Sequence, residues 1–166
     1  MDFSRLLRMA CGLGLVAVMA AVALPVRAET LPEKTSKMER LMRADDYNFK
    51  NSKSASVWSI PFTGKHKSDI KVILAVSEEP GSDLIVVFVT VAEKRHLPVT
   101  ADFMRKLLAE NHELDRVKVG YDSDGDLFVR EDASLRVVDE AELKTIVDQV
   151  YKSADEVYGM VEPNLQ

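Results

Sequence analysis

The chain contains a single cysteine, Cys11, which lies in an uncharged N-terminal stretch. If that stretch is removed, the rest of the chain can form no disulfide framework, no thiol nucleophile and no thiolate metal site. Lys and Arg also nowhere cluster with interleaved aromatic residues, as they do in nucleic-acid-binding segments. We therefore expect a fold held together by its hydrophobic core and no nucleic-acid partner.

Residue patterns typical of catalytic sites are also missing. The histidines, His66, His96 and His112, do not pair at metal-ligand spacing. The segment "NHELDR" is not an H-E-x-x-H site, because Arg116 stands where the second histidine would be. No serine lies in a G-x-S-x-G elbow, and the few glycines form no phosphate-binding loop. We predict no catalytic residues, no metal ligands and no cofactor, so an enzyme would need a constellation assembled only by folding.

The N-terminus has the pattern of a secretory signal peptide. Arg5 and Arg8 precede an uncharged run over 9–26, and Ala28 offers a cleavage point before Glu29. The alternative is an uncleaved anchor helix, since the run approaches the length that spans a bilayer. Pro25 interrupts the run and favours cleavage. We expect a periplasmic or secreted protein that contacts the membrane only through this segment if it is retained.

Removal of residues 1–28 leaves a chain long enough for one domain with one core. The leader takes three Arg and one Asp from totals of 22 basic and 27 acidic residues, which leaves 19 and 26 and a net charge of −7. Such a chain is repelled by phosphate backbones. We assign 29–36 to a polar N-terminal segment and 37–162 to a single α+β domain.

Periodicity predicts the order α-β-β-β-α-β-β-α with an antiparallel sheet. Ser36 and Glu39 form a capping box for the first helix, Thr100 caps the second, and Asp139 caps the last. Pro80-Gly81 supplies a turn between the second and third strands. The predicted elements are a helix over 37–45, strands over 57–62, 70–76 and 84–91, a helix over 101–112, strands over 117–121 and 127–129, and a helix from 139 to 162.

Side chains on the second helix are expected to form a buried stripe at helical spacing, namely Phe103, Met104, Leu107 and Leu108.

The strand "LIVVFVTV", over 84–91, is apolar on both faces. A strand buried on one face would show polar residues at every second position, so both faces of this one need a cover. We predict a homodimer that covers the second face. A C-terminal helix that crosses this strand is the internal alternative.

The segment "VGYDSDGDLFVRED" places Asp122, Asp124 and Asp126 around Gly125. These aspartates match the first ligand positions of an EF-hand loop, but Leu127 stands where that loop needs glycine, and the closing glutamate is absent. Asp-Gly between alternating apolar runs is instead typical of a β-hairpin with a type I′ turn. We predict the hairpin, and a weakly held cation at its tip is the alternative.

The element order resembles the fold of the type III secretion chaperones and of the bacterial YbjN family. The residues that carry the resemblance are "RVKVGYDSDGDLFVRED", similar to that family's strand, acidic turn and second strand, and "VVDEAELKTIVDQVYKSADEVYGMV", similar to its amphipathic last helix with a mid-helix Ala-Asp pair. The resemblance implies an α+β fold, often dimeric, without catalytic residues. Cytosolic secretion chaperones lack an export signal, which this chain carries.

Two classes of function fit these patterns. The first is a non-catalytic, chaperone-like module of the bacterial cell envelope that binds a polypeptide, with Trp58, Ile60 and Phe62 as candidate anchors. The alternative position for these three residues is the core. The second class is a periplasmic protein that binds calcium or a small molecule through the acidic hairpin at 122–126.

Overall fold

The computed structural model describes residues 29–98 and 100–165. Its elements are α1 (Leu31–Ala44), β1 (Lys50–Asn51), β2 (Val57–Phe62), β3 (Ile70–Val76), β4 (Leu84–Ala92), η2 (Lys94–His96), α2 (Ala101–Glu113), β5 (Lys118–Tyr121), β6 (Leu127–Ser134), α3 (Glu140–Val161) and η3 (Glu162–Asn164). The signal-peptide prediction falls on residues 1–28 and lies outside the described residues. Over the ranges that are described, no helix combines the length and the apolar character needed to cross a membrane.

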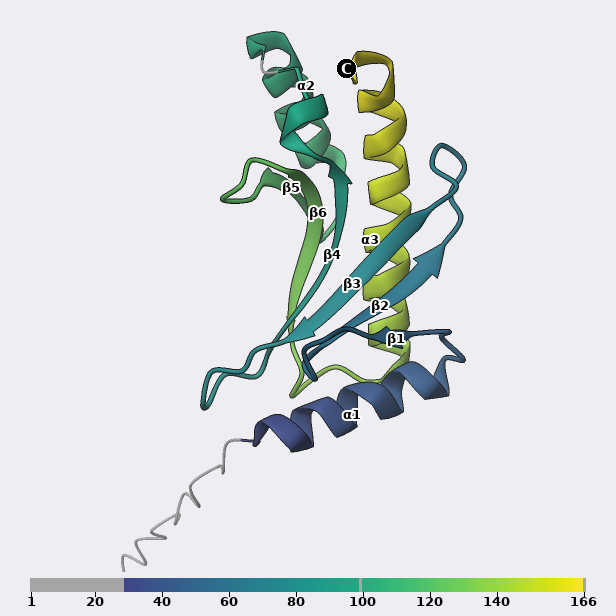
Figure 1. The fold of residues 1–166 in the computed structure, drawn as a ribbon, viewed down its shortest axis with the longest axis vertical. Helices are drawn as coiled ribbons and strands as arrows, with labels where there is room; N and C mark the ends of the chain where they lie inside the picture. The colour runs from purple at the N-terminus through teal and green to yellow at the C-terminus, as the bar shows by residue number, and fades with distance from the viewer. Residues whose placement is uncertain (1–28, 99, 166) are drawn as a thin grey trace, which may run out of the picture.

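The strands form one antiparallel six-stranded sheet in the order β1-β2-β3-β4-β6-β5. Figure 1 shows α3 running along one face of this sheet, α1 lying across its lower end, and α2 at the upper end near β5. The predicted α+β class, meander and hairpin are confirmed. The short strand β1 was not predicted, because its two polar residues carry no apolar alternation and are extended only through pairing with Trp58 and Ser59.

The first helix begins six residues earlier than its predicted start. Thr30, and not Ser36, is the N-cap: its side chain accepts a hydrogen bond from the Glu33 backbone, and the Glu33 carboxylate accepts one from Thr30 N at 2.7 Å. Both serine and threonine stand three residues before a glutamate, so the sequence offers two capping boxes. Pro32 in the first turn favours the earlier one, because proline is tolerated where the backbone N–H has no helical partner.

The turn between β3 and β4 confirms the prediction from Pro80-Gly81. Gly81 has φ of +80°, and Ser82 N donates to Glu79 O at 3.2 Å. Proline followed by a residue at positive φ is typical of a type II turn. The predicted caps of the later helices are also confirmed, since the Thr100 and Asp139 side chains accept from the third residue after each.

The core lies between the sheet and α3. On β4, Ile85, Val87 and Val89 point toward α3 and are at most 2% exposed. The C-terminal helix therefore covers one face of this strand, and a homodimer over the second face of "LIVVFVTV" stays a prediction. On α2, Leu107 is buried, but Leu108 is 70% exposed, so its predicted place in the buried stripe is wrong. The buried stripe of α2 is therefore narrower than the apolar pattern predicted.

Candidate functional site

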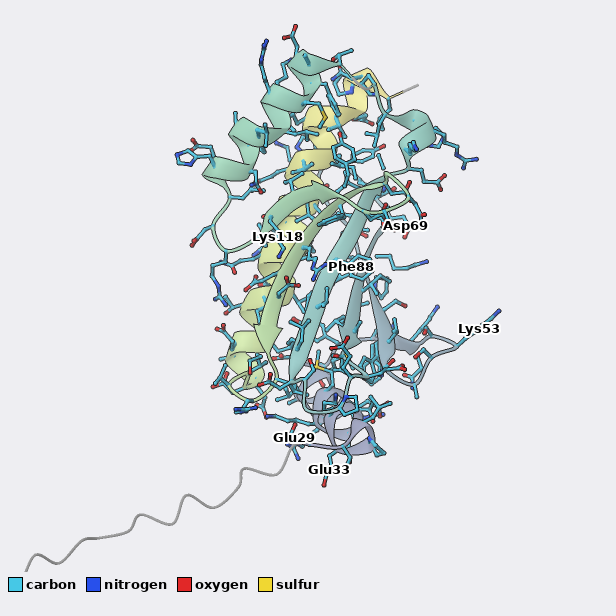
Figure 2. All side chains as sticks on the ribbon, turned by 90° about the vertical axis from the view of Figure 1, so that its left-hand side faces the viewer. Glu29, Glu33, Lys53, Asp69, Phe88 and Lys118 are labelled. Carbon is cyan, nitrogen blue, oxygen red and sulfur yellow. The ribbon has the colours of Figure 1, made fainter. Side chains whose placement is uncertain are left out.

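The sheet face turned away from α3 carries apolar side chains, and no helix of the described residues lies over them. We call this surface the outer face, and Figure 2 shows it with Phe88 near its centre and Lys118 to one side. Register places its apolar side chains next to one another, because residues directly opposite in antiparallel strands point to the same side. They are half-buried or, for Leu84, exposed. The apolar members of the outer face are Val57, Ile73, Ala75, Leu84, Val86, Phe88 and Phe128.

A shallow depression of about 210 Å³ lies in the outer face between β4 and β6. The Phe128 ring forms one wall and lies over Gly120 of β5, where an added Cβ would come within 2.9 Å of the ring. Glycine at this position therefore lets the ring lie flat across the edge strand. The side chains that line the depression are Val86, Phe88, Thr90, Asp122, Phe128 and Arg130.

Charged residues border the apolar part of the outer face. Asp132 receives a hydrogen bond from Arg130 Nε and another from Lys118 Nζ, each at 2.6 Å. Partial burial would raise the pKa of Asp132, but these two donors outweigh burial and hold the pKa below its usual value. The network keeps both cations paired with one carboxylate at neutral pH, so these three side chains together carry one net positive charge.

The predicted anchors lie on the opposite side of the sheet. Trp58 is 0% exposed and Ile60 is 2% exposed, and Trp58 Nε1 donates to Glu39 Oε1 at 3.3 Å. Phe62 is half-buried and stacks on Tyr151 at 4.5 Å between ring centroids. Trp58 and Ile60 therefore lie in the core, which is the alternative position given for these residues. A role of the three residues in binding a partner stays a prediction, and two of them present no surface to a partner in this structure.

The acidic segment forms the predicted hairpin, but its turn differs from type I′. Only Gly125 has positive φ, at +88°, and its N–H donates to Asp122 O at 3.1 Å. A three-residue loop with glycine in the left-handed region has this geometry, a type I turn followed by a bulge. One Asp122 carboxylate oxygen accepts from Asp124 N and Asp126 N, both at 2.9 Å, and Asp126 Oδ1 accepts from Lys94 N.

In the part of the chain that the structure describes, no three His, Cys, Asp or Glu side chains are grouped closely enough to hold a metal ion. Two of the hairpin carboxylates instead bond to backbone N–H groups, which fixes the turn. A loosely held cation at the hairpin tip stays a prediction.

Sequence reasoning missed a buried carboxylate that joins the β2–β3 loop to α3. Asp155 is 7% exposed, and its oxygens accept from the backbone N–H groups of Lys65, His66 and Lys67 at 2.7 to 2.9 Å. Burial would raise the pKa of Asp155, but the three donors hold it below its usual value. At Gly64 an added Cβ would lie 2.1 Å from Asp155 Oδ1, so the loop can approach the helix this closely only with glycine there.

A second buried carboxylate is on β6, on the side of the sheet that faces α3. Glu131 is 4% exposed, and one of its oxygens pairs with Arg116 Nη2 at 2.9 Å, while the same guanidinium pairs with Glu142 at 2.5 Å. Burial is the largest effect on Glu131 and raises its pKa above the usual value. Arg116 has φ of +66°, a backbone conformation that non-glycine residues rarely adopt. The contacts join β6 to the start of α3.

Comparison with known proteins supports the fold. The model of the YbjN family, described as "Putative bacterial sensory transduction regulator", matches residues 38–163. The chain is similar to the crystal structure of YbjN from E. coli, with 15% identity, a TM-score of 0.57, and coverage of 79% of this chain and 94% of that one. No curated protein sequence matches the chain significantly.

Two further similar structures are complexes. The ExsC-ExsE complex is similar at 15% identity and a TM-score of 0.55, covering 80% of this chain and 96% of that chain. The heterodimeric ExoU-SpcU complex, from the type III secretion system of Pseudomonas aeruginosa, is similar at 15% identity and a TM-score of 0.53, covering 78% and 98%. At these identities the likeness establishes the shared fold.

Proposed function

We propose a function from the premise that the chain belongs to the YbjN family, whose model matches residues 38–163. The protein is a non-catalytic, chaperone-like module that binds a polypeptide, and it is exported to the bacterial cell envelope. The observation that carries the binding function is the outer face, where Val86 and Phe88 lie beside Phe128 with no helix over them.

The two faces of β4 differ in a way that favours binding. Val87 is fully buried under α3, whereas its neighbours Val86 and Phe88 keep part of their surface in contact with solvent. A sheet that only needed to be soluble would carry polar residues at these outward positions. Contiguous exposed apolar surface with a charged border is typical of a protein-interaction site.

The chemistry of the surface suits an extended apolar segment. One side chain of the partner fits the depression between Phe88 and Phe128, and its neighbours contact the aliphatic residues of β3 and β4. The net charge of −7 disfavours acidic partners. Two similar structures are complexes, ExsC with ExsE and ExoU with SpcU, which supports a polypeptide as the partner.

Suppression of aggregation tests this function. The purified protein over residues 29–166 is mixed with a thermally unfolded test enzyme, and light scattering is followed. We expect suppression by the wild type and its loss in Phe88→Ser. Val137→Ser is the matched control, because Val137 is 76% exposed but lies outside the outer face. Equal activity of the two variants, or no suppression by the wild type, would contradict the proposal.

A homodimer is the oligomeric state we propose for the free protein. A second copy on the outer face would cover the apolar side of β4, as the pattern "LIVVFVTV" requires. We expect static light scattering at high micromolar concentration to give twice the chain mass, and Phe88→Glu to give the monomer mass. A monomeric wild type under these conditions would contradict the proposed dimer but not the proposed binding of a polypeptide.

Export is tested by expression of the whole chain in a bacterial host. Mass spectrometry of protein from the envelope fraction should give a chain beginning at Glu29, as the signal peptide predicts. An intact N-terminus in the membrane fraction would favour the anchor alternative, and recovery in the cytosol would contradict export.

A further inference from the structure

A gap opens between β3 and β4 at the upper end of the sheet. The two strands pair from Val76 with Ile85 to Ile73 with Phe88, and no further. Beyond that point the first residues of β3 pair with β2 alone, and the last residues of β4 pair with β6 alone. Figure 1 shows the two strands diverging there. We call this gap, between 70–72 and 89–91, the seam.

Lys67 places a positive charge in the seam. Its backbone N–H is held by Asp155, and its side chain reaches across to donate to Val91 O at 3.1 Å, with the ammonium 4.8 Å from the centre of the Tyr158 ring. The side chain is half-buried, and burial lowers the pKa of Lys67, which the charge of Asp69 opposes only in part. Among the described residues, no carboxylate lies within ion-pair distance of its ammonium.

Lys67 and Thr90 line two cavities. The first, of about 380 Å³, is also lined by Val91, Ala92, Glu93, His96, Tyr158 and Leu165, and the exposed Glu93 carboxylate pairs with Arg95 at 2.7 Å. The second, of about 300 Å³, is also lined by the exposed residues Asp69 and Lys71 and by Ile70, Ile73 and Val89. Ile73 belongs to the outer face and lies directly opposite Phe88, so the seam is continuous with the outer face.

We propose that the seam binds the C-terminal carboxylate of a polypeptide that lies along the outer face, with Lys67 as its counter-ion. This inference rests on the proposed function. A partly buried ammonium without a carboxylate partner is stabilised when an anion arrives, because the ion pair offsets its desolvation. Val91, Ala92 and Leu165 form the apolar part of the first cavity, where the terminal side chain would pack. Lys67 is the cation that lines both cavities, so its ammonium can reach an anion in either of them.

Fluorescence anisotropy tests the inference with a labelled peptide of about eight alternating valine and threonine residues, the length of a typical strand. The peptide with a free C-terminal carboxylate is compared with its C-terminal amide on the wild-type protein. We expect the acid to bind about 10-fold or more tightly than the amide, since a charge-assisted hydrogen bond is lost in the amide. This comparison uses only the wild-type protein, so its result does not depend on whether a variant folds.

Variants then assign the effect to the ammonium. In Lys67→Met the acid should bind only as well as the amide, while the affinity for the amide stays within about two-fold of wild type. Lys71→Met is the control, because Lys71 is exposed and lines the same cavity. It should preserve the preference for the acid. Loss of that preference in Lys71→Met alone would overturn the role of Lys67.

The outcomes separate this inference from the proposed function. Equal binding of acid and amide, with both lost in Phe88→Ser, would overturn the carboxylate site and leave polypeptide binding standing. No binding of either peptide would count against both. Butyrate binding as tightly as the peptide acid would overturn the assignment to a polypeptide terminus.

Discussion

Replacing Asp155 with asparagine removes one of the acceptor oxygens that hold the β2–β3 loop on α3. In the wild type, Oδ2 accepts from Lys65 N, and Oδ1 accepts from His66 N and Lys67 N. An amide has one oxygen, so in either orientation its NH₂ group faces at least one backbone N–H. A hydrogen bond to a charged acceptor contributes about 1.5 to 3 kcal/mol, so we expect Asp155→Asn to cost about 2 kcal/mol. Asp155→Ala, which loses all three bonds, should cost about 3 kcal/mol or more.

Urea unfolding of residues 29–166, followed by Trp58 fluorescence, measures this cost, because Trp58 is fully buried. The corresponding fall in melting temperature is about 5 to 8 °C for Asp155→Asn in a domain of this size. Glu156→Gln is the control, since Glu156 is the next residue on α3 and is exposed. A difference below about 0.5 kcal/mol between the two variants, which is the range of ordinary surface substitutions, would refute the reasoning.

The pH dependence gives an independent check. The pKa of Asp155 is lowered in the folded protein. The carboxylate therefore stabilises the fold at any pH above the ordinary pKa of an aspartate in the unfolded chain, which is about 4. This stabilisation is lost as the pH falls through the lowered folded pKa. The difference in unfolding free energy between wild type and Asp155→Asn should therefore be constant above about pH 5 and shrink below about pH 4. A constant difference down to the acid limit of folding would contradict the role of the charge.

Five further substitutions have expected outcomes. Gly64→Ala should destabilise the wild type, and less so in the Asp155→Ala background, because the carboxylate oxygen 2.1 Å from the new Cβ is then absent; a double-mutant cycle measures this. Lys34→Met should cost about 2 kcal/mol, since the buried ammonium donates to two backbone carbonyls of the β3–β4 turn, and hydrogen exchange should become faster there. Val87→Ala should cost about 2 kcal/mol and Phe88→Ser less than about 1, by urea unfolding. Glu131→Gln should leave stability at pH 7 within about 1 kcal/mol, because the raised pKa means that ionisation of this carboxyl opposes folding above about pH 5; a larger loss at pH 7 would contradict this.

Short-range patterns predicted most elements because their causes are local. Strands β2 and β3 follow from alternation and β4 from a continuous apolar run, while the caps at Thr100 and Asp139 follow from side chains that bond three residues away. The failures have longer-range causes. Strand β1 exists only through its pairing with β2. The start of α1 is an exception with a local cause, because Pro32 in the first turn favours the earlier capping box. Leu108 fits the helical period, but α2 presents it to solvent.

The outer face was only partly predictable. The apolar run of β4 showed that both of its faces need a cover, but alternation does not say which face receives the helix. Trp58 and Ile60 belong to the face that α3 covers, and their apolar character fits the core as well as a binding surface. The Asp155 contacts join residues about ninety positions apart. Their only local signal is a carboxylate within the apolar stripe of α3, next to Ala154 in the mid-helix Ala-Asp pair.

The position of Asp155 connects the stability of the loop with the chemistry of the seam. Asp155 Oδ1 accepts a hydrogen bond from Lys67 N, and the Lys67 ammonium donates to Val91 O on the far side of the seam. Disruption of the Asp155 contacts would release the backbone from which this side chain extends. The outer-face substitution Phe88→Ser leaves those contacts intact, because Phe88 lies on the opposite face of β4 from α3. The two changes therefore separate the effects. Asp155→Ala should weaken both the discrimination of the carboxylate and the folding of the chain, whereas Phe88→Ser should weaken polypeptide binding while the fold persists.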